Sequence, residues 1–353
     1  MIEVINPRLY VIYVQLGKNP APTLQKFAKN VYSRFSEVQC ILVTDQVEYW
    51  CDFPGIVIEY TREASAAGLE KFLSNRREYR EIANGYWLFT LERFFALEKG
   101  RDVIQNGIPV IHSESDVMFY PEDSILETIS KDLKNIALPR FNEEYGVGSI
   151  VYFPDFRYVT KLIQLINTEL GGDEVIENDM HLLGNLLNKK LIEELPSGRM
   201  TDREIRFDWR GYQLIFDGAA IGQYLVGQDP LHTGNRRISG YLNPDFPQNL
   251  SKENWGINSV DGKEYITYES GSEKKLVVGL HVHAKLPLND VRQKDAMWER
   301  ILGEANQIIE RTISEPIPDL IHSKKISLNN RLRIARRNGF TKTLVRKLKR
   351  LFQ

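Results

Sequence analysis

Residues 8–44 read RLYVIYVQLGKNPAPTLQKFAKNVYSRFSEVQCILVT and hold two apolar runs on either side of a helical pattern. The runs at 8–15 and 38–44 are rich in β-branched and aromatic residues, which predicts two buried strands. Between them, at 23–35, apolar residues recur at the spacing of an amphipathic helix. A strand, a helix and a strand in this order favour two parallel strands joined by a crossover helix.

The same alternation continues toward the middle of the chain. A strand is predicted at 56–60, a strongly apolar helix at 84–99, and a further strand at 108–113 that runs directly into the acidic segment 114–116. This order is typical of an α/β protein with a Rossmann-like, mostly parallel sheet and helices on both faces. Neither G-x-G-x-x-G nor G-x-x-x-x-G-K-[ST] occurs, which argues against a dinucleotide dehydrogenase and a P-loop enzyme.

The second half of the chain is less regular. A strand is predicted at 148–152, helices at 158–167 and 179–189, and another strand at 276–283. Residues 196–262 are rich in Gly, Asn, Asp, Arg and aromatic residues, a composition that favours strands joined by long loops. Long loops in a compact domain commonly carry function.

Composition and charge set limits on the class of protein. The chain has 353 residues, 42% of them hydrophobic and 26% charged, which excludes a disordered or collagen-like protein. Its two cysteines, Cys40 and Cys51, cannot form a disulfide framework and favour a reducing compartment. No apolar stretch approaches the roughly 20 residues of a membrane span, and we expect no signal peptide. These features predict a cytoplasmic protein.

The net charge of −1 hides a strong asymmetry. Residues 324–353 contain eleven Lys or Arg and no Asp or Glu, which leaves 35 basic against 47 acidic residues in 1–323, a net charge of −12. Within the tail, residues 341–352 place apolar side chains on one helical face and basic ones on the other. Such a helix is typical of binding to an anionic membrane surface. Packing on the body or on another subunit, as in an oligomer, is the alternative, and a nucleic-acid arm is less favoured.

Two carboxylates follow the strand at 108–113. In an extended backbone Glu114 and Asp116 project to the same side, so their oxygens can converge on one divalent cation such as Mg²⁺ or Mn²⁺. An ordinary polar loop after a strand is the alternative. A second group, His281-Val282-His283-Ala284-Lys285, places two histidines and a lysine on one face after an apolar strand. Imidazole binds transition metals and lysine neutralises phosphate, so the two groups together predict a metal–diphosphate site.

In these segments the sequence resembles nucleotide-sugar-dependent glycosyltransferases of the GT-A type, of the sort found in bacterial surface-polysaccharide gene sets. The resemblance covers roughly residues 8–290 and rests on five segments: GYWLFTLERFFALE (85–98), HSESD (112–116), NDM (178–180), FDGAAIGQYL (216–225) and LHVHAK (280–285). It implies a GT-A catalytic domain over residues 1–300, followed by a helical C-terminal extension over 301–353 that carries the basic tail.

The resemblance also implies an activity. It predicts transfer of a sugar from a nucleoside diphosphate sugar to the hydroxyl of a glycan or lipid-linked glycan, with Mn²⁺ or Mg²⁺ stabilising the diphosphate. The D-x-D motif of the family corresponds to residues 114–116, where Glu114 replaces the first aspartate, so Asp116 is the safer ligand. A late histidine, His281 or His283, completes the metal shell, and His283 is the one closer to Lys285 and to the end of the strand. A lipid-linked acceptor would place the protein on the inner face of the membrane.

Three carboxylates are candidates for the catalytic base. The resemblance places a base near Glu177 and Asp179, at the start of a predicted helix, although Asp179 alternatively serves as the N-cap of that helix. Asp217 is the competing candidate, because the small residues after it allow the backbone to approach a sugar closely. A tight strand-to-helix turn is the alternative interpretation of that segment.

Five residues are candidates for binding the nucleotide sugar. Gln15 and Asp45 follow the first two strands and are placed to hold the base, because ligands lie beyond the carboxyl ends of parallel strands. Arg93 is placed to reach the phosphates, and an ion pair with Glu92 or Glu98 is the alternative. Two further candidates are Glu114, at the metal, and Lys285, at the diphosphate.

Two other functions remain compatible with these patterns. A sugar nucleotidyltransferase would share the fold class, but the segment 15–18 (QLGK) is a poor version of the basic, Gly-rich loop that such enzymes use. A non-enzymatic membrane or nucleic-acid adaptor, recruited by its basic tail, would not need carboxylates at the end of a buried strand.

Overall fold

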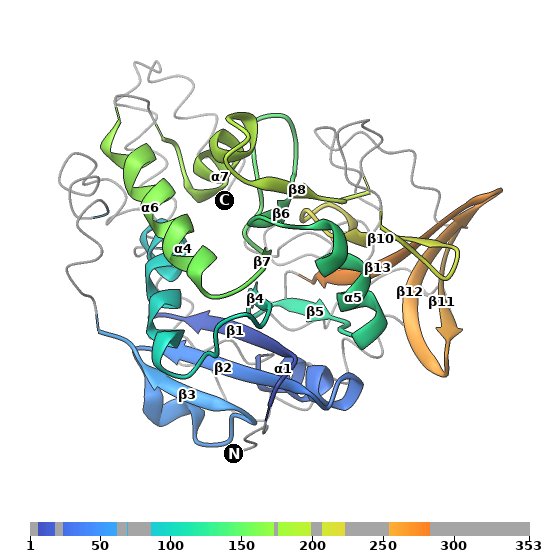
Figure 1. The fold of residues 1–353 in the computed structure, drawn as a ribbon, viewed down its shortest axis with the longest axis horizontal. Helices are drawn as coiled ribbons and strands as arrows, with labels where there is room; N and C mark the ends of the chain where they lie inside the picture. The colour runs from blue at the N-terminus through green and yellow to red at the C-terminus, as the bar shows by residue number, and fades with distance from the viewer. Residues whose placement is uncertain are drawn as a thin grey trace, which may run out of the picture.

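The computed structural model of the chain describes residues 6–17, 24–61, 69, 86–172, 176–198, 207–222 and 254–282. Within these ranges the chain forms two sheets with helices packed against the first (Figure 1). The predicted boundary at residue 300 and the basic tail lie outside the described residues.

The first sheet has seven strands, most of them parallel. The strands are β1 (Leu9–Gln15), β2 (Val38–Thr44), β3 (Ile56–Glu59), β4 (Val110–Ser113), β6 (Ala137–Pro139), β7 (Ile150–Phe153) and β8 (Glu193–Leu195). Their order is β3-β2-β1-β4-β7-β6-β8, and β7 alone runs against its two neighbours. The carboxyl ends of β1, β2 and β4 therefore lie on one edge, which confirms the predicted α/β class with a mostly parallel sheet.

Helices cover both faces of this sheet. Alternate side chains of β1 enter different cores: Val11 packs on the side of α1 (Leu24–Arg34) and α5 (Asp123–Asp132), and Ile12 packs on the other side. That second side carries α4 (Tyr86–Ala96), the short 3-10 helix η4 (Leu97–Asp102), α6 (Arg157–Gly171) and α7 (Asp179–Asn188) (Figure 1). Burial on both faces explains why β1 and β2 are continuous apolar runs.

The second sheet was predicted only in part. Its strands are β5 (Val117–Phe119), β9 (Asp208–Trp209), β10 (Tyr212–Phe216), β11 (Trp255–Val260), β12 (Lys263–Ser270) and β13 (Glu273–His281). The order is β11-β12-β13-β10-β9, and β5 pairs with β13. The strand predicted at 276–283 begins three residues earlier and ends at His281, whereas β5 and α5 were not predicted. Apolar side chains of both sheets share one core, so the second sheet is fixed against the first.

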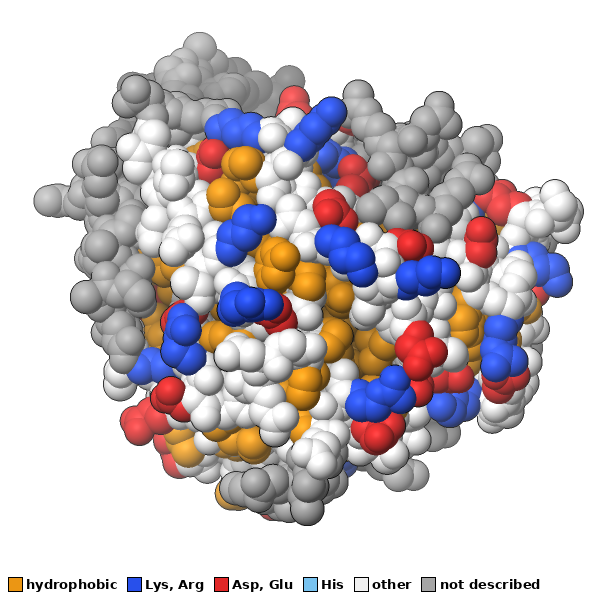
Figure 2. Space-filling view, viewed as in Figure 1, with side chains coloured by type: hydrophobic (Ala, Val, Ile, Leu, Met, Phe, Trp, Pro, Cys, Tyr) orange, Lys and Arg blue, Asp and Glu red, His pale blue; other side chains and the backbone are white. Residues whose placement is uncertain are grey.

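Two further properties bear on a membrane-bound function. No helix within the described ranges is long and apolar enough to cross a bilayer. On the face drawn in Figure 2, acidic and basic side chains are interspersed rather than separated into patches of one sign.

Candidate metal site

The acidic turn, residues 114–116, connects the first sheet to the second. It follows β4 directly and leads into β5, and the N–H of Val117 donates to the carbonyl of Glu114 across it at 3.3 Å. The N–H of Glu114 donates at 2.9 Å to the carbonyl oxygen of Ser149, the residue before β7. The expectation of an extended backbone here is therefore wrong. A tight turn, instead of strand alternation, brings the carboxylates of Glu114 and Asp116 together.

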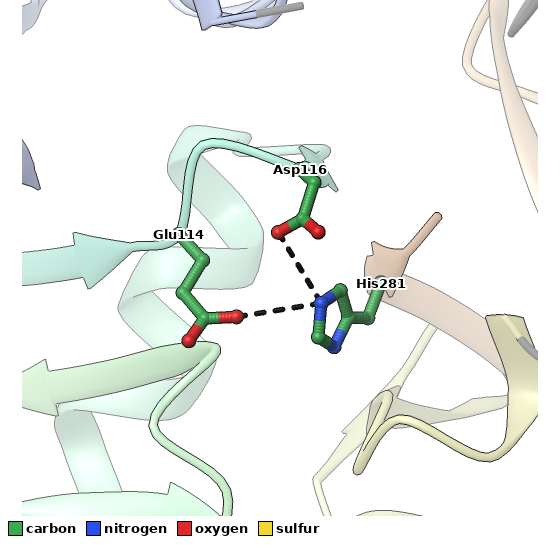
Figure 3. Close-up of side chains that lie close together, drawn as sticks. All are labelled: Glu114, Asp116 and His281. Atoms are coloured by element: carbon green, nitrogen blue, oxygen red, sulfur yellow. Dashed lines mark ion pairs between the residues drawn. The ribbon is translucent and has the colours of Figure 1, made fainter. Parts of the chain in front are cut away.

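His281 reaches this turn through the second sheet. Strand β13 pairs antiparallel with β5, so that His281 lies opposite Val117, and the N–H of Val282 donates to Asp116 O at 2.9 Å. The His281 Nε2 atom lies 3.3 Å from Glu114 Oε2 and 3.2 Å from Asp116 Oδ1 (Figure 3). Sequence analysis left His281 and His283 open; the structure places His281 beside the two acids, while His283 lies outside the described residues.

The geometry of this cluster fits a divalent cation. The three ligand atoms of Glu114, Asp116 and His281 lie within 4.8 Å of one another. Adjacent ligands of an octahedral ion with bonds of roughly 2.1 Å are about 3 Å apart, close to the two distances from the imidazole. The side chains are 20%, 9% and 10% exposed, so a bound ion would meet little bulk water. Two carboxylates and an imidazole suit Mn²⁺ or Mg²⁺ better than a soft, thiolate-seeking metal.

Arg93 pairs with different acids from those considered in the sequence. Its Nη1 donates to Glu114 Oε1, and its Nη2 donates to Asp179 Oδ2 at 2.9 Å. The alternative of an ion pair with Glu92 or Glu98 is wrong: Glu92 accepts from Tyr60 and Glu98 pairs with an arginine of η4. Arg93, on α4, therefore joins the acidic turn to the first residue of α7.

The start of α7 separates the roles of its polar residues. Asn178 is the N-cap, since its side chain accepts from the N–H of His181 at 2.9 Å. The alternative in which Asp179 serves as the cap is therefore wrong; Asp179 is buried and paired with Arg93. Glu177 is exposed and accepts a hydrogen bond from the hydroxyl of Tyr145 at 3.0 Å.

Asp217 is saturated by backbone donors. Its carboxylate accepts from the N–H groups of Ile221 at 2.8 Å, Gly222 at 2.7 Å and His281 at 3.1 Å. Burial raises the pKa of Asp217, and the nearby His281 and the three N–H groups oppose that rise. The residue is 1% exposed. This setting favours a role in fixing the turn at 217–222 and the end of β13 over a role as catalytic base.

The candidates for binding the nucleotide lie at the expected edge. Gln15 ends β1 beside Thr44, the last residue of β2, and Asp45 follows β2 directly. Both carboxylate oxygens of Asp45 accept from the N–H of Gly17, at 3.0 and 3.1 Å. These residues share the carboxyl edge of the sheet with the acidic turn, since β1 lies between β2 and β4. Lys285 lies outside the described residues.

Sequence analysis did not identify two residues that lie near Arg93, namely His112 and Gly148. His112 is fully buried on β4, and its Nδ1 lies 3.1 Å from the carbonyl oxygen of Ile12. Burial, reinforced by the charge of Arg93, lowers the pKa of His112 to about 3, so the imidazole is neutral at pH 7. Gly148 packs against Arg93, because a Cβ there would lie 2.7 Å from Nη2. In the sequence, the signal for this close approach of Arg93 to the backbone is the pattern GVG at 146–148.

Comparisons with known proteins give only distant similarities. No family model matches the sequence, and no curated protein matches the chain. Among solved structures, the galactosyltransferase LgtC in complex with donor and acceptor sugar analogues has a TM-score of 0.37 at 13% identity, covering 67% of this chain and 87% of that one. The glycosyltransferase GlyE of Streptococcus pneumoniae has 0.32 at 14%, covering 54% and 45%. The Pyrobaculum calidifontis mannosyltransferase PcManGT, in complex with GDP-Man and Mn²⁺, has 0.28 at 13%, covering 50% and 51%. None of these values assigns the chain to a family.

Proposed function

We propose that this protein is a divalent-metal-dependent glycosyltransferase of the GT-A type. The observation that supports this most directly is the convergence of Glu114, Asp116 and His281 beyond the carboxyl end of β4. Ligands of mostly parallel sheets bind at that edge, and a divalent ion bound there is suited to a diphosphate. The donor is a nucleoside diphosphate sugar, and the acceptor is a hydroxyl of a glycan or a lipid-linked glycan.

Different residues around the metal site would bind the metal, the nucleoside and the diphosphate of the donor. Glu114, Asp116 and His281 would hold Mn²⁺ or Mg²⁺. Gln15 and Asp45, on the same edge of the sheet, contact the nucleoside, and the hydrogen bonds from Gly17 fix the Asp45 carboxylate for this task. In addition, we assign the diphosphate to two basic residues, Arg93 and Lys285, because a positive charge stabilises phosphate oxygens.

The reaction exchanges one bond at the anomeric carbon for another. The bond from this carbon to the diphosphate oxygen breaks, a bond to the acceptor oxygen forms, and the acceptor proton passes to a base. The metal, when bound, supplies Lewis-acid stabilisation of the departing diphosphate. Of the predicted bases, Glu177 is exposed, whereas Asp179 is held by Arg93 and Asp217 by backbone N–H groups. The carboxylate of Glu177 is therefore the one most open to an acceptor hydroxyl.

The basic tail supplies a location for this reaction. Residues 324–353 carry eleven basic and no acidic residues, and each basic residue near an anionic surface contributes about 1 kcal/mol of binding. We propose that the tail holds the enzyme on the inner face of the membrane, near lipid-linked acceptors. Flotation with vesicles of phosphatidylglycerol should recover the full chain but leave a chain truncated after residue 323 behind. Equal recovery of both forms would refute this role.

The activity is tested by release of nucleoside diphosphate. The full chain is incubated with a panel of nucleoside diphosphate sugars, with Mn²⁺ or with a chelator. We expect release with at least one donor, its loss on chelation, and a decrease of at least about 100-fold in Asp116→Asn. Asp132→Asn, an exposed acid at the end of α5, is the matched control and should retain full activity. Release that persists in Asp116→Asn or in chelator would refute the proposed mechanism.

A further inference from the structure

Arg93 is paired with a carboxylate of the proposed metal site, that of Glu114. We propose that this guanidinium is an internal counter-ion that holds Glu114 in the metal-free protein and releases it when a divalent cation binds, while staying paired with Asp179. This inference rests on the proposed metal site. It assigns to Arg93 control of metal affinity, which is distinct from any contact with the donor.

The carboxylate of Glu114 has two different neighbours. Its Oε1 atom accepts from Arg93 Nη1, and its Oε2 atom lies 3.3 Å from the imidazole of His281. The same carboxylate therefore belongs both to the ion pair and to the candidate metal site. A cation that already neutralises a carboxylate lowers its attraction for a second cation. Metal binding must weaken the pair between Arg93 and Glu114.

Packing keeps Arg93 in place when this pair weakens. Its side chain is 10% exposed, and its second partner, Asp179, is 4% exposed and lies 2.9 Å away. The guanidinium carbon lies 4.9 Å from the centre of the Phe94 ring. Gly148 closes the space beside Nη2. Loss of one of two ion pairs therefore leaves the guanidinium held by the other, and the buried carboxylate of Asp179 stays neutralised.

Among the described residues, the charged side chains of this cluster carry an excess of negative charge. The group formed by Arg93 and its neighbours contains three carboxylates, Glu114, Asp116 and Asp179, against one guanidinium. These four side chains alone, with three negative charges and one positive charge, have a net charge of about −2. A partly buried excess of negative charge is costly, and one divalent cation cancels it. Without Arg93 the excess would be larger and the attraction for a cation stronger.

The test is the affinity for Mn²⁺ of Arg93→Met, measured by calorimetry or by the paramagnetic resonance of free Mn²⁺. Methionine keeps an unbranched apolar side chain like the stem of arginine but removes the guanidinium and its charge. We expect Mn²⁺ to bind at least about tenfold more tightly than to the wild type, which corresponds to about 1.4 kcal/mol. The metal-free melting temperature should fall, and Mn²⁺ should raise it by more than in the wild type. Structural damage alone would weaken binding, so tighter binding identifies the electrostatic role.

A second pair of variants covers the case in which Arg93→Met does not fold. Asp179→Asn removes the carboxylate that Arg93→Met leaves unpaired, so the double variant Arg93→Met/Asp179→Asn has no orphaned buried charge there. The double variant should bind Mn²⁺ at least about tenfold more tightly than Asp179→Asn alone. Arg140→Met breaks another buried ion pair, with Glu194 at 2.9 Å, and should lower stability without tightening Mn²⁺ binding.

The outcomes separate this inference from the function on which it rests. If the wild type binds Mn²⁺ and neither Arg93 variant binds it more tightly than its reference, the counter-ion role is refuted and the metal site stands. If no form of the protein binds Mn²⁺, the metal site itself is refuted, and this inference with it.

Discussion

The substitution Asp217→Asn tests how the fold places His281. The Asp217 carboxylate joins the turn at 217–222 to the end of β13, because it accepts from Ile221 and Gly222 on one side and from His281 on the other. Asparagine keeps the size of the side chain but replaces one acceptor oxygen with a donor. The change therefore removes hydrogen bonds without creating a cavity.

The expected loss follows from the number of buried donors. One carboxylate oxygen accepts from Ile221, and the other accepts from both Gly222 and His281. Whichever way the amide of asparagine is turned, at least one N–H loses its acceptor. A buried unsatisfied donor costs about 1–3 kcal/mol, so we expect Asp217→Asn to lower the free energy of unfolding by about 2 kcal/mol. Asp217→Ala leaves all three donors unsatisfied and should cost roughly 4 kcal/mol or more.

Urea unfolding at pH 7 measures this loss, and a Mn²⁺ titration of the same variants measures its effect on the site. Asp208→Asn, an exposed acid on β9 of the same sheet, is the control and should change stability by less than about 0.5 kcal/mol. We expect Asp217→Asn to weaken Mn²⁺ binding, since His281 loses a backbone anchor. An Asp217→Asn variant as stable as the Asp208→Asn control would refute the anchoring role.

Two further substitutions test local features of the fold. Gly222→Ala should lower the melting temperature by several degrees and weaken Mn²⁺ binding, because its Cβ would lie 1.7 Å from the carbonyl oxygen of His281; Gly171→Ala, with open space around it, is the control. Hydrogen bonds from Arg157 lower the pKa of Asp155, so its contribution is present above the unfolded-state value of about 3.9 and is lost as pH falls through the folded-state pKa. Asp155→Asn should therefore be less stable than the wild type at pH 7 by about 1 kcal/mol. This difference should disappear as the pH falls through the folded-state pKa, and a difference that stays constant in acid contradicts this assignment.

Five strands of the first sheet could be predicted because their signal is local, whereas the three-residue strands β6 and β8 were not predicted. The apolar runs at 8–15 and 38–44 are buried on both faces, and each is a single element that a short window of sequence contains. The second sheet gave less signal. Strand β5 has three residues and forms by pairing with β13, which is distant in the sequence. No local pattern specifies a pairing of that kind.

The candidate site was predicted in its residue types but not in its geometry. The position of Glu114 and Asp116 after a buried strand identified them, although a turn rather than an extended backbone joins them. The choice of His281 depends on the register of β13 against Val117. A shift of two residues would keep the same face and bring His283 there, so strand alternation alone could not decide. The partners of Arg93 come from elements that only the tertiary fold brings together.

The most direct test of the metal site is a calorimetric titration of Mn²⁺ into the 353-residue chain. We predict one site per chain in the wild type and in Asp132→Asn, and the loss of that site in the double variant Asp116→Asn/His281→Ala. If the double variant bound Mn²⁺ as tightly as the wild type, or if the wild type bound none, then Glu114, Asp116 and His281 would not be a metal site.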